Sequence, residues 1–137
     1  GNTSAVVGFG TVAKASPAFA VAVGAMTGIP GSELIGAAIA VTVIAGLTGS
    51  ASGGLSIALP VLAPYSQETD VDMAQLHRIS SIASGALDSL PHNGYVVTTI
   101  RAICGETHRS AYGPVAALTV VIPMVGLVMA VALMHWI

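Results

Sequence analysis

Two long stretches without a charged side chain constrain what this chain can fold into. No Asp, Glu, Lys or Arg occurs from Leu34 to Gln67 or from Ser110 to Met134. Each stretch exceeds the roughly 20 residues that an α-helix needs to cross a bilayer. Of the 137 residues, 54% are hydrophobic and 7% are charged, whereas a soluble domain carries about 25% charged residues. The sequence therefore predicts an integral membrane protein rather than a water-soluble globule.

The same composition excludes two other classes of protein. Disordered segments are poor in apolar residues and rich in charge, which is the reverse of this chain. Nucleic-acid-binding proteins need clustered cations, but the four Lys and Arg residues are scattered and the formal net charge is −2. We therefore expect a lipid bilayer, and no nucleic acid, as a partner. Because the chain opens with Gly1 and no secretory signal follows, we expect a piece of a longer protein.

The clearest candidate for a transmembrane helix is the C-terminal segment, residues 107–137. An apolar series runs from Val115 to Met134 and is followed by His135 and Trp136. That polar and amphipathic pair is typical of the headgroup level. Pro123 lies inside the series, and neighbouring groups in a membrane helix can satisfy the carbonyl that it frees. We predict one spanning helix with a kink.

Residues 32–65 have a different pattern, because seven small residues, 48–54, fill the middle of the apolar stretch. Three of the seven are glycines, which favour leaving a regular helix. We predict helices at Glu33–Leu47, with Ser32 as N-cap, and at Leu55–Ala63, where prolines should end the second helix. Each helix is too short to span a bilayer alone. The pattern predicts a re-entrant hairpin, whose tip survives at membrane depth only where it packs in protein or lines a cavity.

A second interruption follows in residues 72–104. Met73–Ala86 and Gly94–Cys104 are predicted helices, and residues 87–93 break them with Asp, Ser, Pro and Asn inside apolar flanks. Upstream, residues 1–31 are predicted to form a connecting helix near the membrane surface. The predicted fold is all-α: a multi-span integral membrane protein with a re-entrant hairpin and a discontinuous helix, in a single membrane domain.

Asp88 is the most informative residue of the break. A carboxylate within an apolar stretch costs roughly 2.5 to 3.5 kcal/mol at mid-membrane and is normally retained for transport or proton relay. His92 follows four residues later, and an imidazole titrates in the range where proton coupling operates. We assign Asp88 and His92 to proton coupling and expect a hydrogen bond between them. The alternatives are a capping carboxylate and a turn histidine.

The two interruptions also offer groups that suit an anion. Backbone amides that begin a helix lie at the positive end of its dipole, and hydroxyl side chains can contact substrate hydroxyls. As the alternative, Gly49 and Gly53 have the spacing that lets two helices pack closely. The predicted substrate-binding residues are Ser50, Ser52, Gly53, Gly54, Ser89, Asn93 and Gly94.

Enzyme chemistry has less support in the sequence. Ser89 lies beside Asp88 and His92, but one loop does not supply the geometry of a hydrolytic triad, and no Gly-x-Ser-x-Gly elbow is present. Cys104, Glu106 and His108 fall short of a closed zinc site. We therefore expect no enzyme activity, no metal and no cofactor, and we expect the turn at Cys104 to lie at the membrane boundary.

Three motifs resemble one transporter family. Gly46–Ala58 (GLTGSASGGLSIA), Ser84–Gly94 (SGALDSLPHNG) and Cys104–His108 (CGETH) closely resemble the C-terminal third of the gluconate permease (GntP) family. The resemblance covers nearly the whole chain. It implies proton-coupled symport of sugar acids or hydroxy acids by a multi-pass protein of the inner membrane. It also implies inverted repeats, each with a re-entrant hairpin and a broken helix, and a homodimer.

By that resemblance, Glu33–Pro64 would be the hairpin of the second repeat, Met73–Cys104 the broken helix and Thr107–Ile137 the last span. A complete permease is several times longer, so the first repeat would lie outside this chain. The sequence leaves two alternatives to a proton-coupled gluconate symporter. One is a sodium-coupled organic-anion transporter, and the other is a structural membrane module in which the interruptions only serve packing.

Overall fold

The computed structural model describes residues 12, 15, 17, 33–68 and 71–136. Regular structure in these residues is entirely helical, which confirms the predicted all-α class. The helix expected within residues 1–31 and its neighbour Ser32 fall outside the described residues, apart from three isolated positions. In chain order the elements are α3 (Glu33–Thr48), α4 (Ala51–Glu68), α5 (Met73–Ser84), α6 (Gly94–Thr98), the π-helix η1 (Thr99–Ile103), α7 (His108–Ala116), the π-helix η2 (Ala117–Val121) and α8 (Ile122–Trp136).

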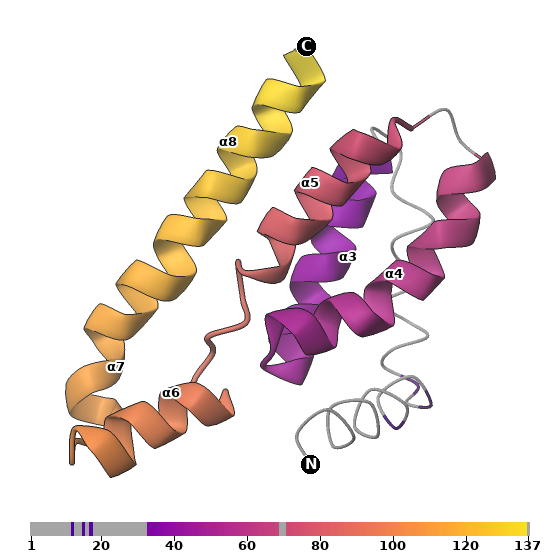
Figure 1. The fold of residues 1–137 in the computed structure, drawn as a ribbon. Helices are drawn as coiled ribbons and strands as arrows, with labels where there is room; N and C mark the ends of the chain where they lie inside the picture. The colour runs from indigo at the N-terminus through magenta and orange to yellow at the C-terminus, as the bar shows by residue number, and fades with distance from the viewer. Residues whose placement is uncertain (1–11, 13–14, 16, 18–32, 69–70, 137) are drawn as a thin grey trace.

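Helix α3 is the centre of the fold and packs against α4, α5 and α8 (Figure 1). Its residues are apolar all round, which is typical of a buried helix. Ile44 of α3, Ile57 of α4 and Ile79 of α5 are almost completely buried and form the middle of the core. Burying a side chain of this size stabilises the fold by about 1.5–3 kcal/mol. A single stripe of α3 remains exposed, and it consists of Ile35, Ile39, Val43 and Leu47.

The turn between α3 and α4 is much shorter than the predicted tip at residues 48–54. Only Gly49 and Ser50 lie outside the two helices, so α4 begins at Ala51 rather than at Leu55. Gly49 has a φ of 59°, a left-handed conformation that glycine adopts without steric cost. The Ser50 hydroxyl accepts a hydrogen bond from the Gly53 amide at 3.1 Å. Because this serine caps the helix, the glycines that follow become its first turn.

Glycines also set how closely neighbouring segments approach α3. A Cβ at Gly54 would lie 2.6 Å from the Cα of Ala45, so α3 and α4 are in backbone contact there. A Cβ at Gly46 would lie 3.2 Å from the Cβ of Leu87 in the break. The close contacts to α3 thus involve Gly46 and Gly54, while Gly49, named in the sequence-based alternative, lies close to His92 rather than to a second helix.

Helix α4 continues past both prolines that were expected to end it and stops at Glu68. Pro60 is exposed, and its missing amide hydrogen removes one hydrogen bond of the helix. A proline inside a helix kinks it where the surrounding turns hold the chain together. The ribbon of α4 changes direction partway along its length (Figure 1). The two prolines therefore bend the second arm of the hairpin instead of ending it.

Helix α5 ends at Ser84, two residues before the predicted end, and the break extends from residue 85 to residue 93. The side chain of Asp72 caps its start by accepting from the Ala74 amide at 2.8 Å. Gly85 ends it with an amide that donates to carbonyls of the last turn. After the break, α6 and η1 turn away from the line of α5 toward the start of α7 (Figure 1). The discontinuous helix is therefore bent as well as interrupted.

The C-terminal segment forms one continuous helical rod made of α7, η2 and α8 (Figure 1). Residues His108–Met134 are the one helix, among those the structure describes, that is long and apolar enough to cross a bilayer. Only 6% of its apolar window is buried against the rest of the structure. The π-helix η2 ends immediately before α8, whose second residue is Pro123. A wider turn there accommodates the proline without breaking the rod.

Candidate functional site

The hairpin turn and the break meet, and Asn93 joins them. The Asn93 amide nitrogen donates to the carbonyl of Gly49 at 2.7 Å and to the carbonyl of Asp88 at 2.8 Å. The side-chain oxygen of Asn93 accepts from the Val96 amide at 3.0 Å and caps α6. One side chain thus ties the hairpin, the break and the resumed helix together. The sequence placed Asn93 in the substrate site, but these three bonds give it a role within the protein.

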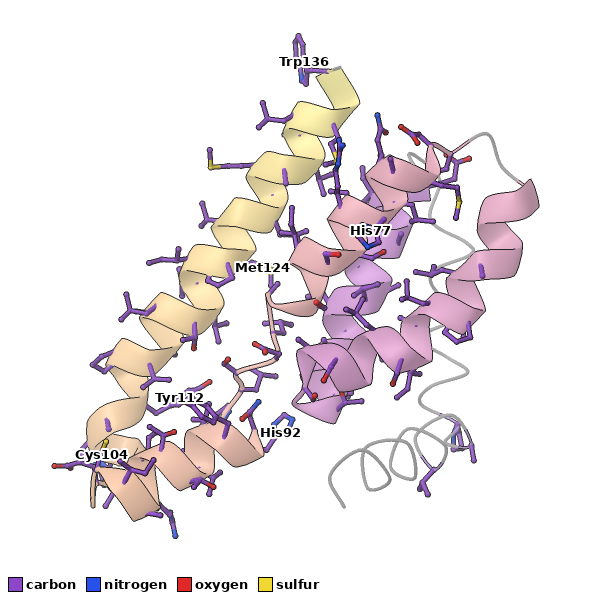
Figure 2. All side chains as sticks on the ribbon, in the orientation of Figure 1. His77, His92, Cys104, Tyr112, Met124 and Trp136 are labelled. Carbon is purple, nitrogen blue, oxygen red and sulfur yellow. The ribbon has the colours of Figure 1, made fainter. Side chains whose placement is uncertain are left out.

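His92 lies beside the hairpin turn (Figure 2). A Cβ added to Gly49 would approach the imidazole at 3.0–3.1 Å, so the ring lies directly over this glycine. His92 is otherwise exposed. The predicted coupling residue is therefore at the junction of the two interruptions and faces open space.

Asp88 has a different partner from the one expected. Its carboxylate accepts a hydrogen bond from the hydroxyl of Ser89 at 2.9 Å. Within residues 71–136, no hydrogen bond joins Asp88 to His92. Asp88 and Ser89 are both half-buried, and the serine hydroxyl is directed to the carboxylate rather than to an imidazole. The ingredients of a nucleophilic triad are thus close in sequence but are not arranged as one.

At the start of α4, hydrogen bonds within the turn occupy two of the predicted donors. The Gly53 amide donates to the Ser50 hydroxyl, and the Gly54 amide donates to the Ser50 carbonyl at 2.8 Å. Gly53 and Gly54 are buried, so neither is an anion-binding donor as predicted. The amides of Ala51 and Ser52 have no hydrogen bond within the described part of the chain. The Ser52 side chain is exposed, and its hydroxyl lies 3.4 Å from that of Ser50.

At the start of α6, Gly94 is exposed and leaves open space. A Cβ at this position would meet no atom within 4 Å. The Val97 amide donates to the Asn93 carbonyl, so Asn93 already satisfies the inner turn of the helix. Gly94 is therefore accessible at this helix start, in contrast to Gly53 and Gly54.

The first turns of α7 also reach the break, and the sequence analysis missed this contact. The Tyr112 hydroxyl donates to the carbonyl of Ser89 at 3.1 Å, and Nε2 of His108 lies 3.1 Å from the carbonyl of Pro91. Figure 2 shows Tyr112 directed from the rod toward the break. The start of α7 thus contacts the break, while the turn before it, residues 104–107, is exposed. The sequence feature that indicates the start of α7 is Thr107, which forms a capping box at the beginning of this helix.

No metal site forms among the residues that the structure describes. His108 is directed to Pro91, Glu106 accepts a hydrogen bond from Ser110 at 2.8 Å, and Cys104 is exposed. These three side chains serve separate contacts or face solvent, although they are close in sequence.

An apolar groove of about 300 Å³ runs between α3 and α8, away from the junction. Thr42 is its polar lining residue, and the Thr42 hydroxyl is satisfied by donating to the carbonyl of Ala83 at 3.3 Å. The remaining walls come from the exposed stripe of α3 and from α8, including Met124 (Figure 2) and Val128. The groove thus has no group that would select a polar ligand.

Comparison with known proteins finds one similarity that bears on function. This chain is 48% identical over 46 residues to a protein of Bacillus subtilis (strain 168) named "Uncharacterized transporter YxjC". The matched segment amounts to 34% of this chain and 10% of that transporter, so the chain spans a small part of its relative. No protein-family model and no solved structure matches this chain. The similarity supports a transporter in general terms, and the resemblance to gluconate permeases stays a prediction.

Proposed function

We propose that this chain is part of a secondary transporter that carries gluconate or a related hydroxy-acid anion together with a proton. The observation that carries the proposal is the hydrogen bond from Asn93 to Gly49, which joins two helix interruptions that are 44 residues apart. Interrupted helices that meet are how many transporters place polar groups at membrane depth. The partial similarity to a transporter supports the same general role.

The anion would bind where the start of α4 meets the break. Helix α4 has 18 residues, and its positive end carries the amides of Ala51 and Ser52, which have no partner among the described residues. The hydroxyls of Ser50 and Ser52 are nearby and would contact the hydroxyl groups of the substrate. An aldonate combines a carboxylate with several hydroxyls, so these amide and hydroxyl donors complement both parts of it.

Asp88 would couple proton movement to anion binding. A carboxylate and an anion in the same site repel each other, so binding of the anion favours the protonated form of Asp88. By reciprocity, proton binding then strengthens anion binding by the same factor. The Ser89 hydroxyl bonded to Asp88 can turn toward the substrate or toward the carboxylate, because a hydroxyl both donates and accepts. His92 would be the exit for the proton, since its imidazole is exposed beside the turn.

The proposed setting is the inner membrane, in a multi-pass protein that forms a homodimer. Helix α3 has 16 residues and is about 24 Å long, which is shorter than the roughly 30 Å hydrocarbon core. A re-entrant position accounts for such a short apolar helix. Its exposed stripe and the exposed face of α8 would contact lipid or the remainder of the longer protein.

Uptake by the full-length protein in proteoliposomes tests the proposal. We expect an inward proton gradient to drive accumulation of labelled gluconate or a shorter hydroxy acid. Asp88→Asn should abolish gradient-driven uptake while exchange of internal for external anion continues. Asp72→Asn is the matched control, because Asp72 is an exposed cap on α5 and asparagine caps equally well.

Three results would contradict the proposal. Wild-type uptake by Asp88→Asn would remove Asp88 from the coupling step. Dependence on a sodium gradient alone would replace the proton with sodium. Failure to transport any hydroxy-acid anion, in a correctly inserted protein, would favour a structural membrane module.

A further inference from the structure

Two side chains of α7 hold the backbone of the break. His108 and Tyr112 are four residues apart and therefore lie on the same face of α7. Their rings stack with centroids 6.1 Å apart. Each ring contacts one carbonyl of the break: Tyr112 reaches Ser89 and His108 reaches Pro91, both at 3.1 Å. A carbonyl only accepts hydrogen bonds, so Nε2 of His108 carries the hydrogen in this contact.

These two contacts complete a continuous series along the backbone. The carbonyl of Asp88 accepts from the Asn93 side chain, and the carbonyl of Leu90 accepts from the Asn93 backbone amide at 2.9 Å. The carbonyls of Ser89 and Pro91 alternate with them and are held by α7. Four successive carbonyls without helical partners are thereby satisfied. Half of the donors come from Asn93 and half from the terminal rod.

General packing does not account for the contacts between α7 and the break. No residue of α7 is buried, and the first residue of the rod that packs against the apolar core is Met124, beyond η2 in α8. A helix end that is held mainly by two directed hydrogen bonds depends on the side chains that make them. Because α7 continues through η2 into α8, the same contacts link the break to the candidate span.

We propose that His108 and Tyr112 are positioning residues that fix the conformation of the break and couple it to the terminal helix. The expected effect on transport rests on the proposed function, because the segment that the two rings hold carries Asp88 and Ser89. Neither ring is placed in the anion site itself. Their effect on transport passes through the shape of the segment between Asp88 and Asn93.

Hydrogen exchange and uptake in the full-length protein test this role together. Tyr112→Phe removes one hydroxyl and keeps the ring. We expect amide exchange in residues 87–93 to accelerate roughly 2- to 10-fold, which corresponds to the net stability of one hydrogen bond. The KM for the anion should rise by a similar factor, with the maximal rate per protein molecule retained. His108→Leu should act in the same direction, and His108→Gln, which keeps a donor, should restore part of the effect.

Tyr95→Phe is the matched control, because Tyr95 is 79% exposed and its hydroxyl makes no hydrogen bond within the described chain. It should change neither exchange nor KM. Unchanged exchange in both Tyr112→Phe and His108→Leu would overturn the proposal, whether or not the protein transports anything. Faster exchange with an unchanged KM in a transporting protein would also overturn it, since the contacts would then be structural only. If the wild-type protein transports no hydroxy acid, the proposed function fails. Hydrogen exchange still tests the positioning role in that case, because wild-type exchange rates in both variants would show that the two contacts do not hold the break.

Discussion

Removing the bridge between the hairpin and the break is the sharpest test of the architecture. Asn93→Ala deletes the cap of α6 and both hydrogen bonds from the side-chain amide. A lost N-cap costs about 1 kcal/mol, and each lost hydrogen bond costs about 0.5–1.5 kcal/mol. We therefore expect the free energy of unfolding to fall by about 2–4 kcal/mol. The assay is equilibrium unfolding of the purified full-length protein in detergent micelles, followed by circular dichroism.

Two further variants separate the cap from the bridge. Asp72→Ala removes an N-cap of α5 whose side chain makes no hydrogen bond to another described element, so it should cost only about 1 kcal/mol. Asn93→Asp keeps an oxygen for the cap but places a second oxygen against two carbonyls, so it should destabilise at least as much as Asn93→Ala. If Asn93→Ala equals Asp72→Ala, or if Asn93→Asp is as stable as the wild type, the bridge contributes nothing and the reasoning is wrong.

Two other predictions concern packing and the membrane. Gly54→Ala should destabilise the protein by about 1–3 kcal/mol, because the new methyl group would overlap the backbone of α3. Gly126→Ala adds a methyl group that meets no atom within 4 Å, so it should stabilise α8 by about 0.5–1 kcal/mol. Equal effects of the two variants in thermal unfolding would contradict the close contact at Gly54. Val125→Lys, on the exposed face of α8, should raise the apparent free energy of membrane insertion by about 2.5–3.5 kcal/mol if that face meets lipid. A change within about 0.5 kcal/mol, as at an ordinary water-exposed site, would refute the membrane position.

The sequence predicted where the chain leaves its helices, because those signals are local. Uncharged runs, clustered small residues and the Asp–Ser–Pro–Asn segment located the hairpin turn and the break to within a few residues. The hydrogen bond between Asn93 and Gly49 joins these two segments in the structure. The resemblance motifs and the local pattern pointed to the same two segments.

The details that the sequence did not predict depend on which of several possible hydrogen-bond or packing partners a residue contacts. Ser50 was predicted only as a ligand contact, and in the short turn at Gly49 its oxygen also accepts the capping hydrogen bond of α4. Gly53 and Gly54, which were predicted as anion donors, are buried in the first turn of the capped helix. Pro60 was expected to stop α4, but flanking apolar contacts override the loss of one hydrogen bond. The contact between Tyr112 and Ser89 joins residues 23 apart, and no local pattern identifies such a pair.

The π-helix η2 has a geometric consequence for the terminal rod. An α-helix advances by about 100° per residue around its axis, so one additional residue in a turn rotates everything beyond it by roughly that amount. The rotation brings the face of α7 that carries His108 and Tyr112 to the same side as the face of α8 that carries Met124 and Leu127. In a helix without the widened turn, only one of these two faces would lie against its partner, either the break or the core of the fold. The widened turn at Ala117–Val121 therefore lets one side of a continuous helix contact both the break and the core.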